Sequence, residues 1–283
     1  MHLDHRMFER HQYALINPLQ IDRRIIRLWP CEPIVPKELR GQRNLFPYLL
    51  QLDEMAADAR LVALDDTVNY AREHERSPFS ALLVCQAGSD HLRRHLARMM
   101  VRKIEGEQML FRYYDPRVWN ALRWILSPSQ LDALLGPIQS WTAPMGCNDS
   151  WDACDNKGSR NVQLRFASDQ IHPISALASV NKVIDRLHQE RCGADSFSLS
   201  KQVFNEIIKA AELGLIDADD QEAFAFVSMI HSPAIHAGPL YQEALRIAIE
   251  EPGAYRSMVA GALDDEEVES SLQKQHQGVW QHG

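Results

Sequence analysis

The sequence lacks both a secretory signal and any apolar run long enough to cross a bilayer. Its first residues, MHLDHRMFERHQYALINP, carry scattered charges, whereas a signal peptide needs an uninterrupted apolar segment. A membrane-spanning helix needs about 20 consecutive apolar residues. We therefore expect a cytoplasmic protein without a membrane partner.

Cysteine is scarce, and acidic residues outnumber basic ones. The five cysteines are odd in number and irregularly spaced, which indicates reduced thiols rather than a disulfide framework. The formal net charge is −8, whereas binding to a nucleic-acid backbone requires a basic face that displaces counterions. We therefore expect neither a structural disulfide nor a nucleic-acid partner.

Three common marks of enzyme chemistry are also missing. The chain has no G-x-S-x-G nucleophile elbow, no G-x-x-x-x-G-K-[ST] phosphate loop and no G-x-G-x-x-G dinucleotide loop. On this basis we expect no cofactor and no enzymatic activity.

Several histidines invite a metal interpretation that the surrounding sequence does not support. His91 and His95 are spaced i, i+4, so a helix would place both imidazoles on one face. The Glu of an H-E-x-x-H motif is absent, and no acidic or thiolate third ligand lies one turn before or after the pair. We interpret this pair, and likewise His231 and His236, as surface or packed histidines, and we expect no metal.

Cysteine offers two further candidate sites. Cys147 and Cys154 lie among aspartates, but their spacing fits neither a zinc CxxC pair nor a calcium loop. A solvated loop is the favoured interpretation there. Cys85 ends an apolar run, where burial raises the pKa of a thiol and blunts its reactivity, so we interpret it as a core residue.

Local patterns predict an α/β lobe in which helices flank a mixed sheet. Short apolar runs rich in β-formers indicate strands at Tyr13–Ile16, Leu61–Leu64, Ala81–Cys85 and Met109–Tyr114. Helical patterns alternate with these runs at Ser89–Val101, Trp119–Leu126 and Ser129–Leu135.

The patterns further divide the chain into four parts. Residues 1–141 form the α/β lobe, and the turn-rich residues 142–169 form a connecting loop with a candidate strand at Asn161–Phe166. Residues 170–263 show helical periodicity alone, with one helix ending at Gly214, the next starting at Asp217 and another over Pro239–Glu250. The acidic and polar residues 264–283 have little to bury, so we expect disorder.

One segment concentrates charged and aromatic residues at the end of a predicted strand. In QMLFRYYDPRVWNALRWILSPSQLDALLGPIQSW, two short helices follow Arg112, Tyr114, Asp115, Pro116 and Arg117. The two guanidiniums can form bidentate pairs with the carboxylate, and the proline pre-sets the turn into the helix. We favour a structural role for this motif, with partner contact as the alternative. It supplies no nucleophile with an adjacent base.

Phe111–Val118 and Leu131–Trp141 resemble the hallmark of the type VI secretion effector-adaptor family, also catalogued as domain of unknown function 4123. That hallmark is an FRxYDPRV-like strand end, a helix and an L-x-x-x-x-G-P-x-x-x-W closure. Upstream, Tyr13–Leu15, Phe46–Leu49 and the Leu92–Leu96 "LRRHL" helix look like further family elements. Ala210–Leu215 is similar to a family element of the helical region, although more loosely.

The resemblance implies an adaptor or chaperone that binds a specific toxic effector in the cytoplasm and helps to load it onto the VgrG spike. The effector would bind a face of the helical lobe, since helix faces are natural receptors for helices. Two alternatives remain open, namely a scaffold component of the secretion apparatus without cargo specificity and a cysteine- or metal-dependent hydrolase.

Overall fold

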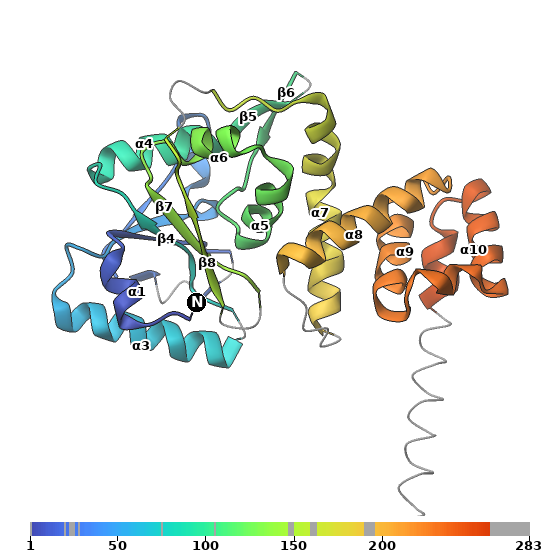
Figure 1. Ribbon diagram of the computed structural model, residues 1–283, viewed down its shortest axis with the longest axis horizontal. Coiled ribbons are helices and arrows are strands. Elements are labelled where there is room, and N and C mark those ends of the chain that lie inside the picture. Colours follow the sequence, from blue (N-terminus) through green and yellow to red (C-terminus); the bar gives the residue numbers. More distant parts are fainter. Residues whose placement is uncertain are drawn as a thin grey trace, which may run out of the picture. The chain divides into compact units, whose positions relative to one another are not determined.

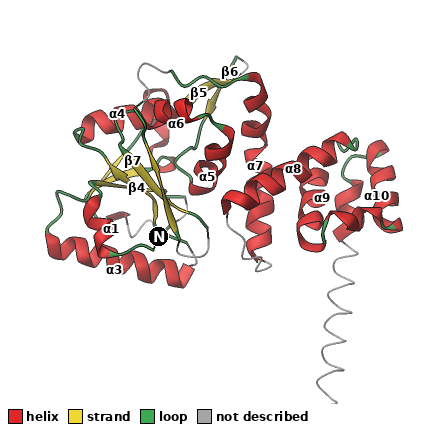
Figure 2. Cartoon of the chain, viewed as in Figure 1, coloured by secondary structure: helices red, strands yellow, loops and turns green. Residues whose placement is uncertain are grey.

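A computed structural model describes residues 2–19, 21–22, 26–27, 29–74, 76–104, 106–146, 150–158, 163–189 and 196–260. The chain divides into two compact units, the first running to Leu177 and the second beginning at Ala178. The first unit contains the sheet and its flanking helices, and the second is helical (Figures 1 and 2). The predicted fold class, an α/β lobe followed by an all-helical lobe, is therefore confirmed.

The first unit is organised around a six-stranded sheet in which every pairing is antiparallel. The strand order is β2-β3-β1-β4-β7-β8, so the sheet is antiparallel throughout rather than mixed. The strand bounds are β1 Tyr13–Ile16, β2 Cys31–Pro33, β3 Tyr48–Gln51, β4 Phe79–Val84, β7 Ser140–Pro144 and β8 Trp151–Asp155. A separate two-stranded ribbon pairs β5 (Val101–Ile104) with β6 (Glu107–Leu110).

Both faces of the six-stranded sheet are buried. In β1, Tyr13 and Leu15 join one apolar cluster while Ala14 and Ile16 join the other, as the two-residue period of a strand requires. The first face is covered by α4 (Ser89–Met100), α5 (Pro116–Ile125) and α6 (Pro128–Leu135). The second face is covered by α1 (His5–Arg10) and α3 (Ala57–His74). The unit is thus a three-layer α/β/α sandwich with η1 (Lys37–Leu45) as a connecting 3₁₀ helix.

Two secondary-structure predictions for this unit are wrong. Leu61–Leu64, predicted as a strand, lies inside α3, because a four-residue apolar run has no period that distinguishes strand from helix. The predicted strand at Met109–Tyr114 ends at Leu110, since residues 113–115 turn into α5.

The predicted boundary near Trp141 also differs from the structure. β7 continues to Pro144, and β8 follows within the range 142–169 that was predicted to be a connecting loop. β8 is an edge strand of alternating polarity, and its pairing with β7, rather than its composition, makes it a strand. The described part of the predicted strand at Asn161–Phe166 is irregular, and the rest lies outside the described residues.

The second unit is helical, as predicted. Its elements are the later part of α7 (Ser168–Gln189), α8 (Ser196–Glu212), α9 (Ala218–His231), the 3₁₀ helix η2 (Pro233–Ala237) and α10 (Pro239–Glu250), followed by a helical stretch at 254–260. Gly214 has a φ of +98°, and Asp217 caps α9, as the pattern predicts. The predicted disordered residues 264–283 lie outside the described residues.

Helix α7 contributes to both cores. Ile174 and Leu177 belong to the core of the first unit, whereas Val180, Val183 and Ile184 belong to the core of the second. Within the described ranges, none of the helices combines the length and apolar character needed to cross a bilayer.

Candidate functional site

The charged motif after β6 builds the start of α5. Asp115 is the N-cap, and its carboxylate accepts hydrogen bonds from the Arg117 backbone N–H at 3.1 Å and from Nε and Nη2 of the same side chain at 3.1 and 3.0 Å. Pro116 occupies the first turn, where its missing N–H costs nothing. Arg117 therefore forms the bidentate pair that the pattern predicts.

Burial separates the motif residues into two kinds. Tyr114 is fully buried, and Asp115 is 5% exposed. Burial raises the pKa of the Tyr114 hydroxyl, and the positive charge of Arg112 partly offsets that rise. Arg112 itself lies exposed, so of the five motif residues it is the most accessible to a partner.

The segments that carry the family resemblance meet in one core. The Tyr113 hydroxyl donates to the Leu96 carbonyl of α4 at 3.1 Å, which joins the FRYYDPRV strand end to the "LRRHL" helix. Trp119 of α5 stacks on Trp141 of the closure with ring centroids 4.6 Å apart. Segments far apart in the sequence thus specify a common packing arrangement.

His95 belongs to the same arrangement and has a structural partner. Its Nε2 lies 2.9 Å from the Leu134 carbonyl at the end of α6, and its ring faces Gly136. A Cβ atom at Gly136 would lie only 2.2 Å from His95 Cε1. Burial lowers the pKa of His95, so the neutral ring is favoured. His91, its predicted i, i+4 neighbour, is exposed.

The cysteine candidates are distributed over different elements. Cys85 is buried as predicted, its thiol lies 3.4 Å from the Pro137 carbonyl, and burial raises its pKa. Cys154 lies half-buried in β8, where burial likewise raises its pKa, and Cys147 lies outside the described residues. Across the ranges described, no group of three or more His, Cys, Asp or Glu side chains is arranged to hold a metal ion.

A buried histidine cluster in the second unit has the spacing of a nucleophile and base. His236 Nε2 lies 2.7 Å from Ser228 Oγ, and Nδ1 lies 2.9 Å from the Tyr255 hydroxyl. The imidazole stacks on Phe224 at 3.7 Å, and burial together with the charge of Lys209 lowers its pKa to about 4. Ser228 is only 2% exposed. A weakly basic imidazole beside a buried serine stabilises packing rather than activating a nucleophile.

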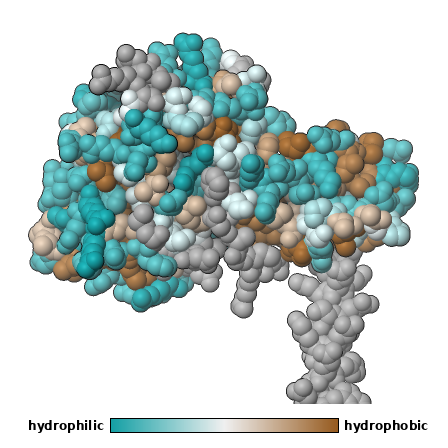
Figure 3. All heavy atoms as spheres, viewed as in Figure 1, coloured by the Kyte–Doolittle hydropathy of each residue, from teal (hydrophilic) through white to brown (hydrophobic). Residues whose placement is uncertain are grey.

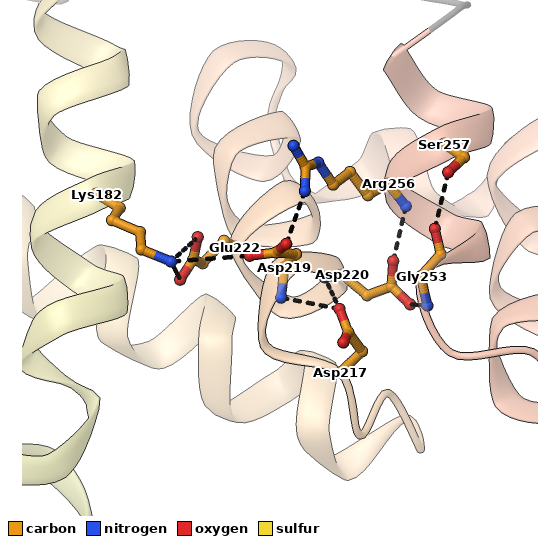
Figure 4. Close-up of polar contacts among 8 residues, drawn as sticks. All are labelled: Lys182, Asp217, Asp219, Asp220, Glu222, Gly253, Arg256 and Ser257. Carbon is orange, nitrogen blue, oxygen red and sulfur yellow. Dashed lines mark hydrogen bonds and ion pairs between the residues drawn. The ribbon is translucent and has the colours of Figure 1, made fainter.

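A second polar network ties three helical segments of this unit together (Figure 4). Lys182 of α7 lies 3.0 Å from Glu222 and 3.7 Å from Asp219 of α9, and Asp219 also pairs with Arg256 at 2.7 Å. Asp220 is fully buried and accepts hydrogen bonds from the Gly253 and Arg256 backbone N–H groups at 2.7 and 2.8 Å. It therefore caps the helix at 254–260, a long-range role that its position in the first turn of α9 does not reveal.

The second unit also exposes apolar side chains. Leu213, Ile216 and Ile249 are 44%, 76% and 53% exposed, and we call them the 213–249 patch. A Cβ atom at Gly214 would lie 3.3 Å from Ile249 Cγ1, so the turn between α8 and α9 packs against the end of α10. Figure 3 shows apolar surface over the helical elements. Sequence reasoning missed this patch; the apolar Ile216 in the turn between Gly214 and Asp217 was the available signal.

The motif and the residues that pack against it thus belong to the core of an α/β/α domain. Residues 34–133 match the model of the family described as a domain of unknown function (DUF4123), as the resemblance predicts. The match includes the whole FRYYDPRV segment and stops within α6, before the G-P and W positions of the closure. Comparison with curated proteins and with solved structures gives no match.

Proposed function

We propose that this protein is a cytoplasmic adaptor of a type VI secretion system that binds a specific toxic effector and helps to load it onto the VgrG spike. The FRYYDPRV segment, which lies within the DUF4123 match, carries the proposal. Asp115 and Arg117 engage each other, and Cys85 is a buried thiol with a raised pKa, so neither feature supports the alternative of a cysteine-dependent hydrolase.

The effector binds the helical unit, and the 213–249 patch is the centre of the binding site. An exposed apolar patch rimmed by polar residues is the kind of surface that partner proteins cover. Ile216 contributes most to the binding free energy, because it is 76% exposed in the free protein. Burying such a side chain contributes about 1.5–3 kcal/mol. The neighbouring side chains Glu212, Glu250 and Glu251 are exposed. The nearby cations Lys209 and Arg246 pair with Glu206 and Glu243, so the unbalanced charge of the rim is acidic. An effector helix with an apolar face and basic flanks is complementary to this surface.

The test is affinity capture of the tagged protein from its native cytoplasm, followed by mass spectrometry. The wild-type chain is expected to retain a toxin, with or without a VgrG spike protein. The Ile216→Asp variant is expected to lose that toxin by at least about tenfold. Leu61→Asp is the matched control, because Leu61 is a 55% exposed leucine on α3 of the other unit.

Each contrary result points to a different conclusion. Recovery of spike or sheath proteins to the same extent with and without a toxin identifies a scaffold without cargo specificity. Retention of neither a toxin nor a secretion component overturns the proposal and reopens the search for an enzyme. Equal retention of the toxin by wild type and Ile216→Asp leaves the adaptor function in place and removes the 213–249 patch as its site.

A further inference from the structure

The β5–β6 ribbon is an unusual feature of the first unit, because it is separate from the six-stranded sheet (Figure 1). Its register pairs Val101 with Leu110 and Ile104 with Glu107. Within the described ranges, β6 pairs with β5 alone. A two-stranded ribbon is marginally stable by itself, and its outer strand presents an edge to which another strand can pair.

The hydrogen-bond alternation shows which groups of β6 face outward. The Phe111 N–H donates to the Met100 carbonyl at 2.7 Å, so this opposed pair is hydrogen-bonded. Positions alternate along an antiparallel ladder, which makes Met109 a hydrogen-bonded position and places Gln108 and Leu110 at non-bonded ones. The backbone N–H and C=O groups of Gln108 and Leu110 therefore point away from β5. Among the described residues, nothing outside the ribbon makes a backbone hydrogen bond to either of them.

The side chains of β6 are also accessible. Every residue of β6 is exposed, including the apolar Met109 and Leu110 at 37% and 38%. An edge with free backbone groups and apolar side chains offers an added strand both ladder hydrogen bonds and side-chain pockets.

The charge around the ribbon defines the partner's chemistry. Arg94 and Arg98 of α4 and Arg102 and Lys103 of β5, which we call the 94–103 cations, outnumber the carboxylate of Glu107, the one acidic residue among the described positions of the ribbon strands. Within the part of the chain that the structure describes, none of the four forms an ion pair. The Arg102 guanidinium is held in place by the Arg98 and Met99 carbonyls at 2.8 and 3.1 Å.

The 94–103 cations are close enough to attract an acidic strand that is added to β6. Neighbouring strands lie about 4.8 Å apart, so a strand added to β6 is about 10 Å from the backbone of β5. That distance is similar to the Debye length of about 8 Å at physiological salt, so the charges of β5 are only partly screened at the added strand. A second copy of this chain would bring like charges together, whereas an acidic segment is attracted.

We propose that the outer edge of β6 binds an extended acidic segment of a partner protein, with apolar residues at alternate positions, as a third strand of the ribbon. The N–H and C=O groups of Gln108 and Leu110 pair with the segment, and the 94–103 cations select its charge. The apolar side chains of the segment alternate and therefore lie on one face, where they contact Met109. This surface lies in the α/β/α unit and is distinct from the effector site proposed on the helical unit. The two proposals can therefore be tested independently.

The proposal is tested on the full chain with three fluorescein-labelled peptides. The first alternates Glu and Val, and the second alternates Lys and Val. The third is the Glu–Val peptide N-methylated at every residue, so that neither of its edges keeps an N–H group for a ladder. We expect wild-type protein to bind only the first, with an affinity that falls as salt rises, and binding to protect the Gln108 and Leu110 amides from hydrogen exchange.

Two variants of Leu110 isolate the backbone contribution. Leu110→Pro removes an N–H that points away from β5, so the ribbon loses no internal hydrogen bond, and proline is tolerated at such edge positions. We expect it to weaken binding of the Glu–Val peptide by roughly five- to tenfold, while Leu110→Thr, which keeps the N–H, changes it less than about twofold.

Several outcomes overturn the proposal. They are the absence of Glu–Val binding to wild type, equal binding of the Lys–Val or N-methylated peptide, and equal effects of the two Leu110 variants at unchanged thermal stability. Self-association of the wild-type chain that Leu110→Pro abolishes also overturns it, by showing that the edge pairs with a second copy.

Discussion

At the scale of single residues, close packing decides which glycines of the first unit tolerate a side chain. Gly136 has a φ of +58° and faces the His95 ring, so a side chain there meets both backbone strain and a steric clash. Gly106 also has a positive φ, of +93°, but a Cβ atom added there would have no other atom within 4 Å. Substitution at Gly106 therefore reports backbone strain alone, whereas substitution at Gly136 reports strain together with a steric clash.

We expect Gly136→Ala to lower the free energy of unfolding by about 2–4 kcal/mol, because overpacking adds to backbone strain. Gly106→Ala should cost only about 1 kcal/mol. Urea denaturation checks both values. In a double-mutant cycle, His95→Ala should recover part of the Gly136→Ala loss. Strictly additive effects would show that the His95 ring is not the obstacle.

His236 gives the stability of the second unit a dependence on pH. Its folded-state pKa of about 4 lies below the ordinary histidine value of 6.5, so the unfolded chain binds the proton more tightly. Stability is therefore fully present above pH 6.5 and is lost as pH falls towards 4. At 1.4 kcal/mol per pKa unit, the full loss amounts to roughly 3 kcal/mol.

The measurement is the free energy of unfolding at pH 7 and at pH 5 for wild type and His236→Gln. Burial lowers the pKa values of His11 and His95 in the same direction, so the variant should flatten the profile without abolishing its slope. An unchanged slope in His236→Gln would contradict the assignment to this residue.

At the scale of elements, one side chain of α9 determines where the helix at 254–260 starts. Asp220 accepts the Gly253 and Arg256 N–H groups, and the loss of an N-cap typically costs about 1 kcal/mol. Because Asp220 is fully buried, Asp220→Ala should cost more, roughly 2–3 kcal/mol.

Hydrogen exchange tests this capping role. Asp220→Ala should increase exchange across residues 254–260, whereas the adjacent Asp219→Ala should have little effect, since Asp219 makes partly exposed ion pairs with Lys182 and Arg256. Similar exchange in the two variants would show that charge in this region, rather than the cap, maintains the helix.

At the scale of the whole molecule, two separate cores predict two responses to mutation. Phe224 belongs to the core of the helical unit and Leu122 to that of the sheet unit, and replacing either by alanine should cost about 2–5 kcal/mol. We expect Phe224→Ala to increase amide exchange in α9 and leave α5 protected, and Leu122→Ala to do the reverse. Equal loss of protection in both helices with either variant would indicate one cooperative unit.

The sequence alone determined those features that depend on local chemistry. The strand at Tyr13–Ile16, the turn into α5 at Pro116 and the start of α9 at Asp217 all follow from side chains acting within a few residues. The Asp115–Arg117 pair was predictable for the same reason, because its members are two residues apart. The FRYYDPRV motif likewise indicates the DUF4123 domain, because its residues are contiguous in the chain.

Tertiary structure alone decided the features that depend on residues distant in sequence. Trp151–Asp155 is a strand because β7 offers it a free edge, and Leu61–Leu64 is helical because α3 packs along the sheet. The contact between His95 and Gly136, the cap that Asp220 provides to a later helix and the exposure of Ile216 all require the chain to be folded first. Local preferences amount to a few tenths of a kcal/mol per residue and are overridden when burial, at about 25 cal/mol per Å², favours another arrangement.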